Sequence, residues 1–181
     1  MRKADTIRHK GKKLSDILDA HAKFHKGLPG GERADLSGAN LSKSDLRKRD
    51  LTGANLTGSN LQRADLRGSK LSFADLSRAD LRRADLRNCD FTETNLEGAD
   101  LSEADLSGTE LFRGNLSSAK LHKTILRGTV LRQANLRGAD FSGSDLALAS
   151  FREIDLTDVK LDGADLKDAV VRDIKSKQSA Q

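Results

Sequence analysis

From Leu36 to Val171 every fifth residue is apolar, and the phase never slips. These positions number 28, of which 24 are Leu, three are Phe and the last is Val. The residue two places before each of them is small in 25 cases, and the residue one place before is usually Asp or Asn. The repeated unit therefore reads A-[D/N]-L-x-x, where x is mostly polar.

A five-residue period excludes a single regular element. In an α-helix it advances the leucines by about 140° at each step, and in a straight strand it sends successive leucines to opposite sides. A short extended triplet followed by a two-residue corner brings them together instead. Four such units, about 20 residues in all, close a square with the leucines inside. Stacked squares form a parallel β-solenoid. Twenty-eight units predict about seven coils.

The runs ADLSGANLSKSDL, LTGANLTGSNLQRADLRGSKL and ADLSRADLRRADL resemble pentapeptide-repeat proteins of the bacterial type. The resemblance covers residues 34–171 and implies an all-β solenoid, a right-handed quadrilateral parallel β-helix. It implies a fold and no particular activity, since the family shares none. Its best-understood members resemble DNA in shape and negative charge and bind type II topoisomerases, which makes gyrase one partner to consider.

The chain divides into three expected segments. Residues 1–33 form a basic N-terminal segment, with a capping helix at about 14–25 that covers the first coil. Residues 34–171 form the repeat β-helix, and residues 172–181 form a disordered tail. The amphipathic pattern behind the helix consists of Leu14, Ile17, Leu18, Ala22 and Phe24.

Composition and motifs argue against an enzyme. The many Asp and Ser residues recur as ladder positions, and the chain has no phosphate-binding loop, metal-ligand cluster or paired nucleophile and base. We expect no cofactor, no metal and no small-molecule substrate. Cys89 falls at an inward position and is expected to be an inert buried thiol. The start of the chain leads into no apolar signal core, so we expect a cytoplasmic protein.

Basic residues gather on the first three coils when the sequence is folded in steps of 20. In one interpretation they pair with Asp45, Asp65 and Asp85 and only keep the surface in solution. In the other they form an anion site for phosphates of nucleic acid or membrane lipid, although no aromatic residues are interleaved for base stacking. This predicted strip comprises Lys43, Arg47, Lys48, Arg63, Arg67, Arg82, Arg83 and Arg87.

Apolar residues replace polar ones at four outward positions. Ile125 and Val130 stand where Asp or Asn is usual, and Phe112 and Leu148 occupy turns. Folding by 20 places the four on two adjacent faces, so they predict an exposed patch that contacts a partner or a second copy. Isolated surface apolar residues are common, which is the alternative.

The end of the repeats is unusually apolar. Val170, Val171 and Ile174 predict either an end-to-end dimer, as the family resemblance implies, or a C-terminal segment that folds over the last coil. At the other end, Arg49 is the one charge at an inward small-residue position. It is expected either to pair with Asp16 or Asp19 of the capping helix or to reach water through the open end.

The charge is distributed unevenly. Residues 1–33 hold nine basic and four acidic side chains, whereas residues 34–171 hold 20 and 22. The expected function is a non-enzymatic rigid scaffold for protein–protein interaction with an unidentified partner. The first alternative is a DNA-mimicking modulator of a type II topoisomerase, although the rod lacks the required acidity. The second is binding to an anionic membrane or nucleic acid through the basic N-terminal segment and the strip.

Overall fold

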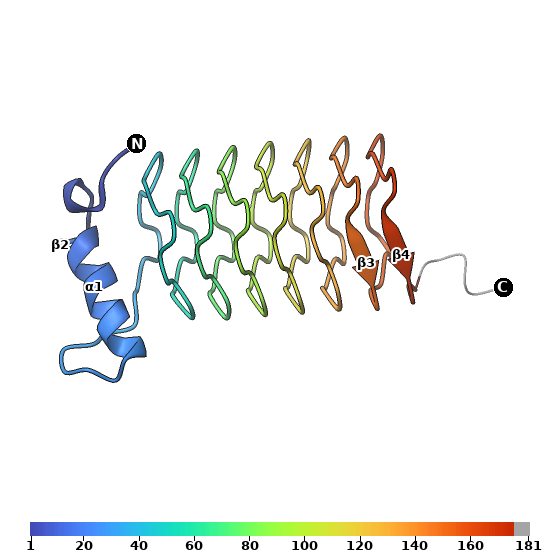
Figure 1. Ribbon diagram of the computed structural model, residues 1–181. Coiled ribbons are helices and arrows are strands. Elements are labelled where there is room, and N and C mark those ends of the chain that lie inside the picture. The colour runs from blue at the N-terminus through green and yellow to red at the C-terminus, as the bar shows by residue number, and fades with distance from the viewer. Residues whose placement is uncertain (176–181) are drawn as a thin grey trace.

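A computed structural model describes residues 1–175, which form a stack of coils with a helix at its N-terminal end (Figure 1). Along the repeats, parallel bridges join residues 20 apart, from Asp35 with Asn55 to Asp155 with Lys175. Single bridges of this kind recur along the stack, and in the last coils they lengthen into β3 (Ser150–Arg152) and β4 (Val170–Arg172). The expected parallel β-helix is confirmed.

Each corner is a tight turn. In the first unit the Ala39 N–H donates to the carbonyl oxygen of Leu36 at 3.0 Å. Gly38, the residue before Ala39, has a φ of 65°, as a type II turn requires. The Asp35 carboxylate accepts the backbone N–H of Ser37 at 3.2 Å, and similar bonds recur along the chain. This bond explains why Asp or Asn precedes the leucine, because either side chain can stabilise the turn that follows.

The interior is filled by the register residues. From Leu36 to Phe151 all of them are buried, with at most 2% of the side chain exposed. Several hydroxyl groups at the small-residue position bond to the previous coil, as Ser69 Oγ does to the Leu46 carbonyl oxygen at 2.7 Å. The Cys89 thiol makes the equivalent contact with Leu66 at 3.0 Å. Between residues 36 and 151 the interior is thus filled by apolar side chains, which leaves little room for a substrate.

The N-terminal segment forms η1 (Ala4–Thr6), a hairpin of β1 (Arg8–His9) and β2 (Lys12–Lys13), and α1 (Leu14–His25). The helix therefore forms where the sequence predicted it. α1 buries Leu14, Ile17 and Leu18 in the same cluster as the leucines of the first coil.

The first residues of the chain add a short strand to the first coil. The Arg2 N–H donates to the Lys43 carbonyl oxygen at 2.7 Å, and the Asp45 N–H donates to the Arg2 carbonyl oxygen at 2.9 Å. Arg2 bridges Ser44 in parallel, which sets Lys3 beside Asp45 in the same register. The sequence does not predict this pairing, because residues 1–6 carry no repeat motif.

The pairing also continues past the expected end of the repeats at 171. β4 includes Arg172, and Lys175 bridges Asp155. Residues 172–175 thus belong to the coil and not to a tail, whereas the remainder of the expected disordered tail, residues 176–181, lies outside the described residues.

Candidate interaction surfaces

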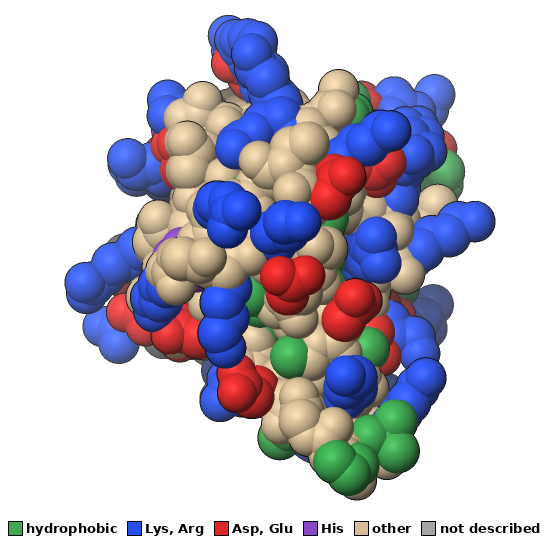
Figure 2. Space-filling view, turned by 90° about the vertical axis from the view of Figure 1, so that its left-hand side faces the viewer, with side chains coloured by type: hydrophobic (Ala, Val, Ile, Leu, Met, Phe, Trp, Pro, Cys, Tyr) green, Lys and Arg blue, Asp and Glu red, His purple; other side chains and the backbone are tan. Residues whose placement is uncertain are grey.

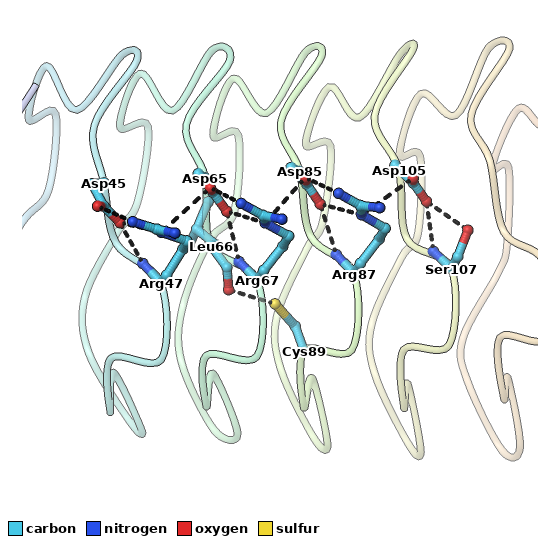
Figure 3. Close-up of polar contacts among 10 residues, drawn as sticks. All are labelled: Asp45, Arg47, Asp65, Leu66, Arg67, Asp85, Arg87, Cys89, Asp105 and Ser107. Atoms are coloured by element: carbon cyan, nitrogen blue, oxygen red, sulfur yellow. Dashed lines mark hydrogen bonds and ion pairs between the residues drawn. The ribbon is translucent and has the colours of Figure 1, made fainter. Parts of the chain in front are cut away.

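Carboxylates and guanidinium groups alternate along one face of the β-helix (Figure 3). The Asp65 carboxylate accepts hydrogen bonds from Nε and Nη2 of Arg67 at 2.9 and 2.7 Å. Its Oδ2 also lies 3.5 Å from Nε of Arg47 in the preceding coil. Asp85 stands in the same way between Arg87 and Arg67. These residues, with Asp45 and Asp105 at the ends, form what we call the ion-pair ladder.

Electrostatics within the ion-pair ladder favour the charged carboxylates. Hydrogen bonds from the Arg47 guanidinium lower the pKa of Asp45 to about 2. Those from Arg67 lower the pKa of Asp65 below its usual value, although burial of that carboxylate opposes the effect. The side chain of Asp65 is only 5% exposed. Its charge is therefore satisfied inside the protein, and the neighbouring arginines are held in place by it.

The predicted basic strip is divided by these contacts. Besides the three arginines of the ladder, Arg82 binds Asp80 at 2.7 Å and Arg83 binds Glu103 at 2.9 Å. Five of the eight strip residues are thus already paired. The other three, Lys43, Lys48 and Arg63, form no ion pair among residues 1–175, although Arg63 lies near Glu103 and is attracted to it.

The predicted lateral patch is exposed unevenly. Ile125 takes the place of a ladder aspartate, bridging Asp105 and Asp145, and is 39% exposed. Leu148, at a turn with a φ of 61°, is 61% exposed. Val130 and Phe112 lie on the next face along the chain and are half-buried.

Phe112 is also covered by cations. The guanidinium carbons of Arg113 and Arg132 lie 4.9 and 5.7 Å from its ring centroid, within the range of a cation–π contact. Ile125 and Leu148 are therefore the members of the predicted patch that offer most apolar surface to a partner.

One exposed aromatic side chain was missed by the sequence reasoning. Phe73 is 58% exposed and has a φ of 60°, at the second residue of a turn. The same position holds glycine in many other units, such as Gly53 in the preceding coil. An apolar residue at this position was the signal, and it was used for Leu148 but not for Phe73.

At the C-terminal end the register residues lose their cover. Leu166 is 40% exposed and Val171 is 45% exposed, although the equivalent residues of earlier coils are buried. Val170 and Ile174, the other members of the predicted end surface, are half-buried. Leu156 and Leu161 are also only partly buried. The last coil thus ends in an apolar face, which we call the terminal face, with Leu166 as a member that was not predicted.

Arg49 does not form the ion pair expected with the helix. Neither Asp16 nor Asp19 pairs with it within the described residues, and its side chain is exposed. Its backbone N–H is held by Ser69 Oγ at 3.2 Å. The side chain instead lines an open cleft together with Lys3 and Asp5. The aspartates of α1 were the wrong partners, because the first residues of the chain and not the helix approach this corner.

Reactive groups are few and well shielded. Burial raises the pKa of the Cys89 thiol to about 12, so it carries almost no thiolate at neutral pH. The buried His21 accepts the Ala34 N–H on Nδ1 at 3.1 Å, which leaves its proton on Nε2, facing His25. That bond gives His21 a structural role at the junction of α1 and the first coil. Residues 1–175 contain no group of three or more His, Cys, Asp and Glu side chains placed to hold a metal.

No helix among the described residues has the length and apolar character needed to cross a membrane.

Comparisons with known proteins agree with this architecture. Residues 34–72, 69–108, 115–152 and 134–173 match the family described as pentapeptide repeats, in eight copies. No curated protein matches the chain.

Several solved structures are similar. HetL, a pentapeptide repeat protein involved in heterocyst differentiation regulation from the cyanobacterium Nostoc sp. strain PCC 7120, is 31% identical, with 76% of this chain and 83% of that chain covered and a TM-score of 0.34. A pentapeptide repeat protein from the thylakoid lumen of Arabidopsis thaliana is 30% identical over 61% and 67% of the two chains, with a TM-score of 0.28. QnrB1, a plasmid-mediated fluoroquinolone resistance protein, is 25% identical over 82% and 87%, with a TM-score of 0.30.

Proposed function

The chain belongs to the pentapeptide-repeat family, and on that premise we propose that it is a non-enzymatic rigid scaffold that binds another protein. The observation that carries the proposal is the terminal face. Leu166 and Val171 are 40% and 45% exposed at positions that every earlier coil buries. A contiguous apolar surface on a soluble rod marks a contact site, because leaving it in water costs free energy.

The scaffold has two different ends in this proposal. Residues 1–33 act as the cap of a right-handed β-helix of about seven coils, since α1 places Leu14 and Ile17 over the leucines of the first coil. At the other end, none of residues 1–175 covers the terminal face. Binding through one end while the other stays closed would give assemblies of defined size instead of open filaments.

We propose that the terminal face pairs with the terminal face of a second copy. The last coil presents apolar side chains and the outer edge of β4, and within residues 1–175 no further coil pairs with that edge. A two-fold contact between two such faces buries the same residues of each copy, which makes the surface self-complementary. The alternative in which a C-terminal segment folds over this end concerns residues 176–181, which lie outside the described residues.

Light scattering after size-exclusion chromatography tests this pairing. The full chain is expected at twice its mass of 19.7 kDa, and Leu166→Asp with Val171→Asp is expected to elute as a monomer. Ile125→Asp with Phe112→Ser, in the lateral patch, is the matched control and is expected to leave the dimer intact. A monomeric wild type would remove the terminal face from the proposal. A dimer that only the lateral variant breaks would move the contact to Ile125.

The topoisomerase alternative has less support in this chain. A DNA mimic needs a broadly negative surface, whereas arginines neutralise the aspartates of the ion-pair ladder one by one. A gyrase supercoiling assay with the purified chain separates the two ideas, since we expect no inhibition and no protection. The anionic-surface alternative would be revealed by binding to DNA or anionic vesicles that weakens steeply with salt.

A further inference from the structure

A cleft of about 660 Å³ opens between the N-terminal segment and the first coil. Figure 2 looks at this end of the molecule, where Lys and Arg side chains cover much of the surface and carboxylates lie among them. The cleft has a mixed but mainly positive lining. Its charged residues are Lys3, Arg47, Lys48, Arg49, Asp5 and Asp45.

The cleft exists because the N-terminal segment covers only part of the first coil. The backbone of the segment bonds to this side of the coil at Arg2 alone among the described residues, through Lys43 and Asp45. The chain then enters η1 at Ala4 and adds no strand above the next corner. That corner consists of Arg47, Lys48 and Arg49, and it remains open to solvent.

Arg49 departs from the repeat at this corner, whereas Lys48 occupies a turn position that also holds Lys or Arg in several other units. Arg49 occupies a position that elsewhere holds a small or apolar side chain, and Ser69 takes its place one coil later. Lys48 has a φ of 55°, a conformation that favours glycine, and Gly68 follows it in the next coil. Two cations thus stand at the edge of the cleft where the second coil carries Gly and Ser. The fold does not need either of them.

The charges in the cleft are not balanced. Arg47 is bound by Asp45 at 2.7 Å and approaches Asp65 at 3.5 Å. Lys3, Lys48 and Arg49 form no ion pair with any described residue. Asp45 also attracts Arg49. Asp5 is the other carboxylate in the lining, so four cations face two carboxylates. Ammonium and guanidinium groups that converge on one hollow favour a ligand with more than one negative charge.

We infer that this cleft binds a small phosphate-bearing ligand, whose phosphate oxygens accept hydrogen bonds from Lys48 and Arg49. Its volume of about 660 Å³ falls within the range of small-molecule sites. The concave shape suits a compact ligand, because a flat membrane surface would gain little from cations inside a hollow. The inference does not depend on how the terminal face is used.

Titration of the full chain with sodium pyrophosphate, followed by calorimetry and by amide signals in NMR spectra, tests the site. We expect saturable binding that shifts the signals of residues 3–5 and 45–49. The double variant Lys48→Gly with Arg49→Ser restores the residues of the second coil, so it should fold, and it is expected to weaken binding by about tenfold or more.

The matched control is Lys123→Gly with Arg137→Ser. Lys123 also lies at a turn with positive φ and is followed one coil later by Gly143, and Arg137 stands where Ser117 stands one coil earlier. This control removes the same charges far from the cleft and is expected to keep the wild-type affinity. Equal weakening in both double variants, signal shifts confined to other residues, or no saturable binding would each overturn the inference. Binding to vesicles containing phosphatidic acid without binding of pyrophosphate would also overturn it.

Discussion

The Asp65 carboxylate accepts two hydrogen bonds from the Arg67 guanidinium, and only 5% of the Asp65 side chain is exposed. Arg47 of the preceding coil approaches the same carboxylate at 3.5 Å. A single carboxylate thus ties two coils together through charge as well as through the backbone. This arrangement differs from a simple surface ion pair, because one partner is withdrawn from water.

Replacing Asp65 by Asn tests the contribution of that charge. An Asn side chain can still accept the backbone N–H of Arg67, so the turn is kept while the charged bonds are weakened. We expect Asp65→Asn to lower the free energy of unfolding by about 1 kcal/mol, as measured by urea denaturation. Asp45→Asn is the control, since that carboxylate is 33% exposed and ends the ladder. An equal loss in the two variants would show that burial of Asp65 adds nothing.

Stability is expected to depend on pH in the acid range. The folded protein holds the pKa of Asp45 at about 2 and lowers that of Asp65 and Asp80, chiefly through arginine hydrogen bonds. A carboxyl group whose pKa is lowered by folding stabilises the protein above its unfolded pKa of about 4 and loses that contribution as pH falls through the folded value. The urea midpoint should therefore fall between about pH 4 and pH 2.

Asp65→Asn combined with Asp80→Asn tests how much these two arginine-bonded carboxylates contribute to the acid sensitivity. The double variant should show a shallower decline of the urea midpoint over the same pH range. A decline as steep as that of the wild type would place the sensitivity in other carboxylates.

Phe73 tests the strain of the turns. Its φ of 60° is unfavourable for a residue with a Cβ, and its exposed ring gains little from packing. We expect Phe73→Gly to be more stable than Phe73→Ala by up to about 1 kcal/mol, because both lose the ring and only glycine relieves the backbone. Thermal melting of the two variants measures the difference. A more stable Ala variant would contradict the role assigned to the turn conformation.

The burial gradient along the rod predicts a gradient in mutational cost. Leu56 is fully buried, so Leu56→Ala should cost about 2–5 kcal/mol of unfolding free energy. Leu166 occupies the same register position but is 40% exposed, and Leu166→Ala should cost less than half as much. Urea denaturation at protein concentrations low enough to keep the chain monomeric gives the comparison. Equal costs would mean that the terminal face is covered in solution.

The β-helix itself could be predicted from the sequence because one physical requirement, the burial of a side chain every five residues, recurs from Leu36 onward. Isolated departures from that pattern, such as Ile125, could be seen for the same reason. The contacts that long side chains make with neighbouring coils could not be predicted from the sequence. The sequence predicts an exposed Phe112, but Arg113 and Arg132 lie over its ring. The rotamers of these arginines depend on the neighbouring coils.

The N-terminal cleft was beyond sequence reasoning for a different reason. Arg49 was correctly singled out as an anomaly, but its surroundings depend on Arg2, which pairs with the first coil from outside the repeat. Nothing in the pattern of residues 1–6 indicates a strand. The periodic part of the chain can therefore be predicted from its sequence, whereas its contacts with the aperiodic N-terminal segment cannot.

Because the parallel bridges join residues 20 apart, the position of a residue in the sequence determines the face of the β-helix on which it lies. Each five-residue unit advances the chain by about a quarter turn, and each group of four raises it by about 4.8 Å. Deleting 20 residues from the middle would remove one coil and leave every remaining residue on its original face of the β-helix. Deleting only five residues would rotate every later residue, including Ile125 and Leu148, by about a quarter turn onto the adjacent face of the β-helix. Comparing partner binding by the two deletion variants would show whether the partner needs two surfaces on the same face of the β-helix.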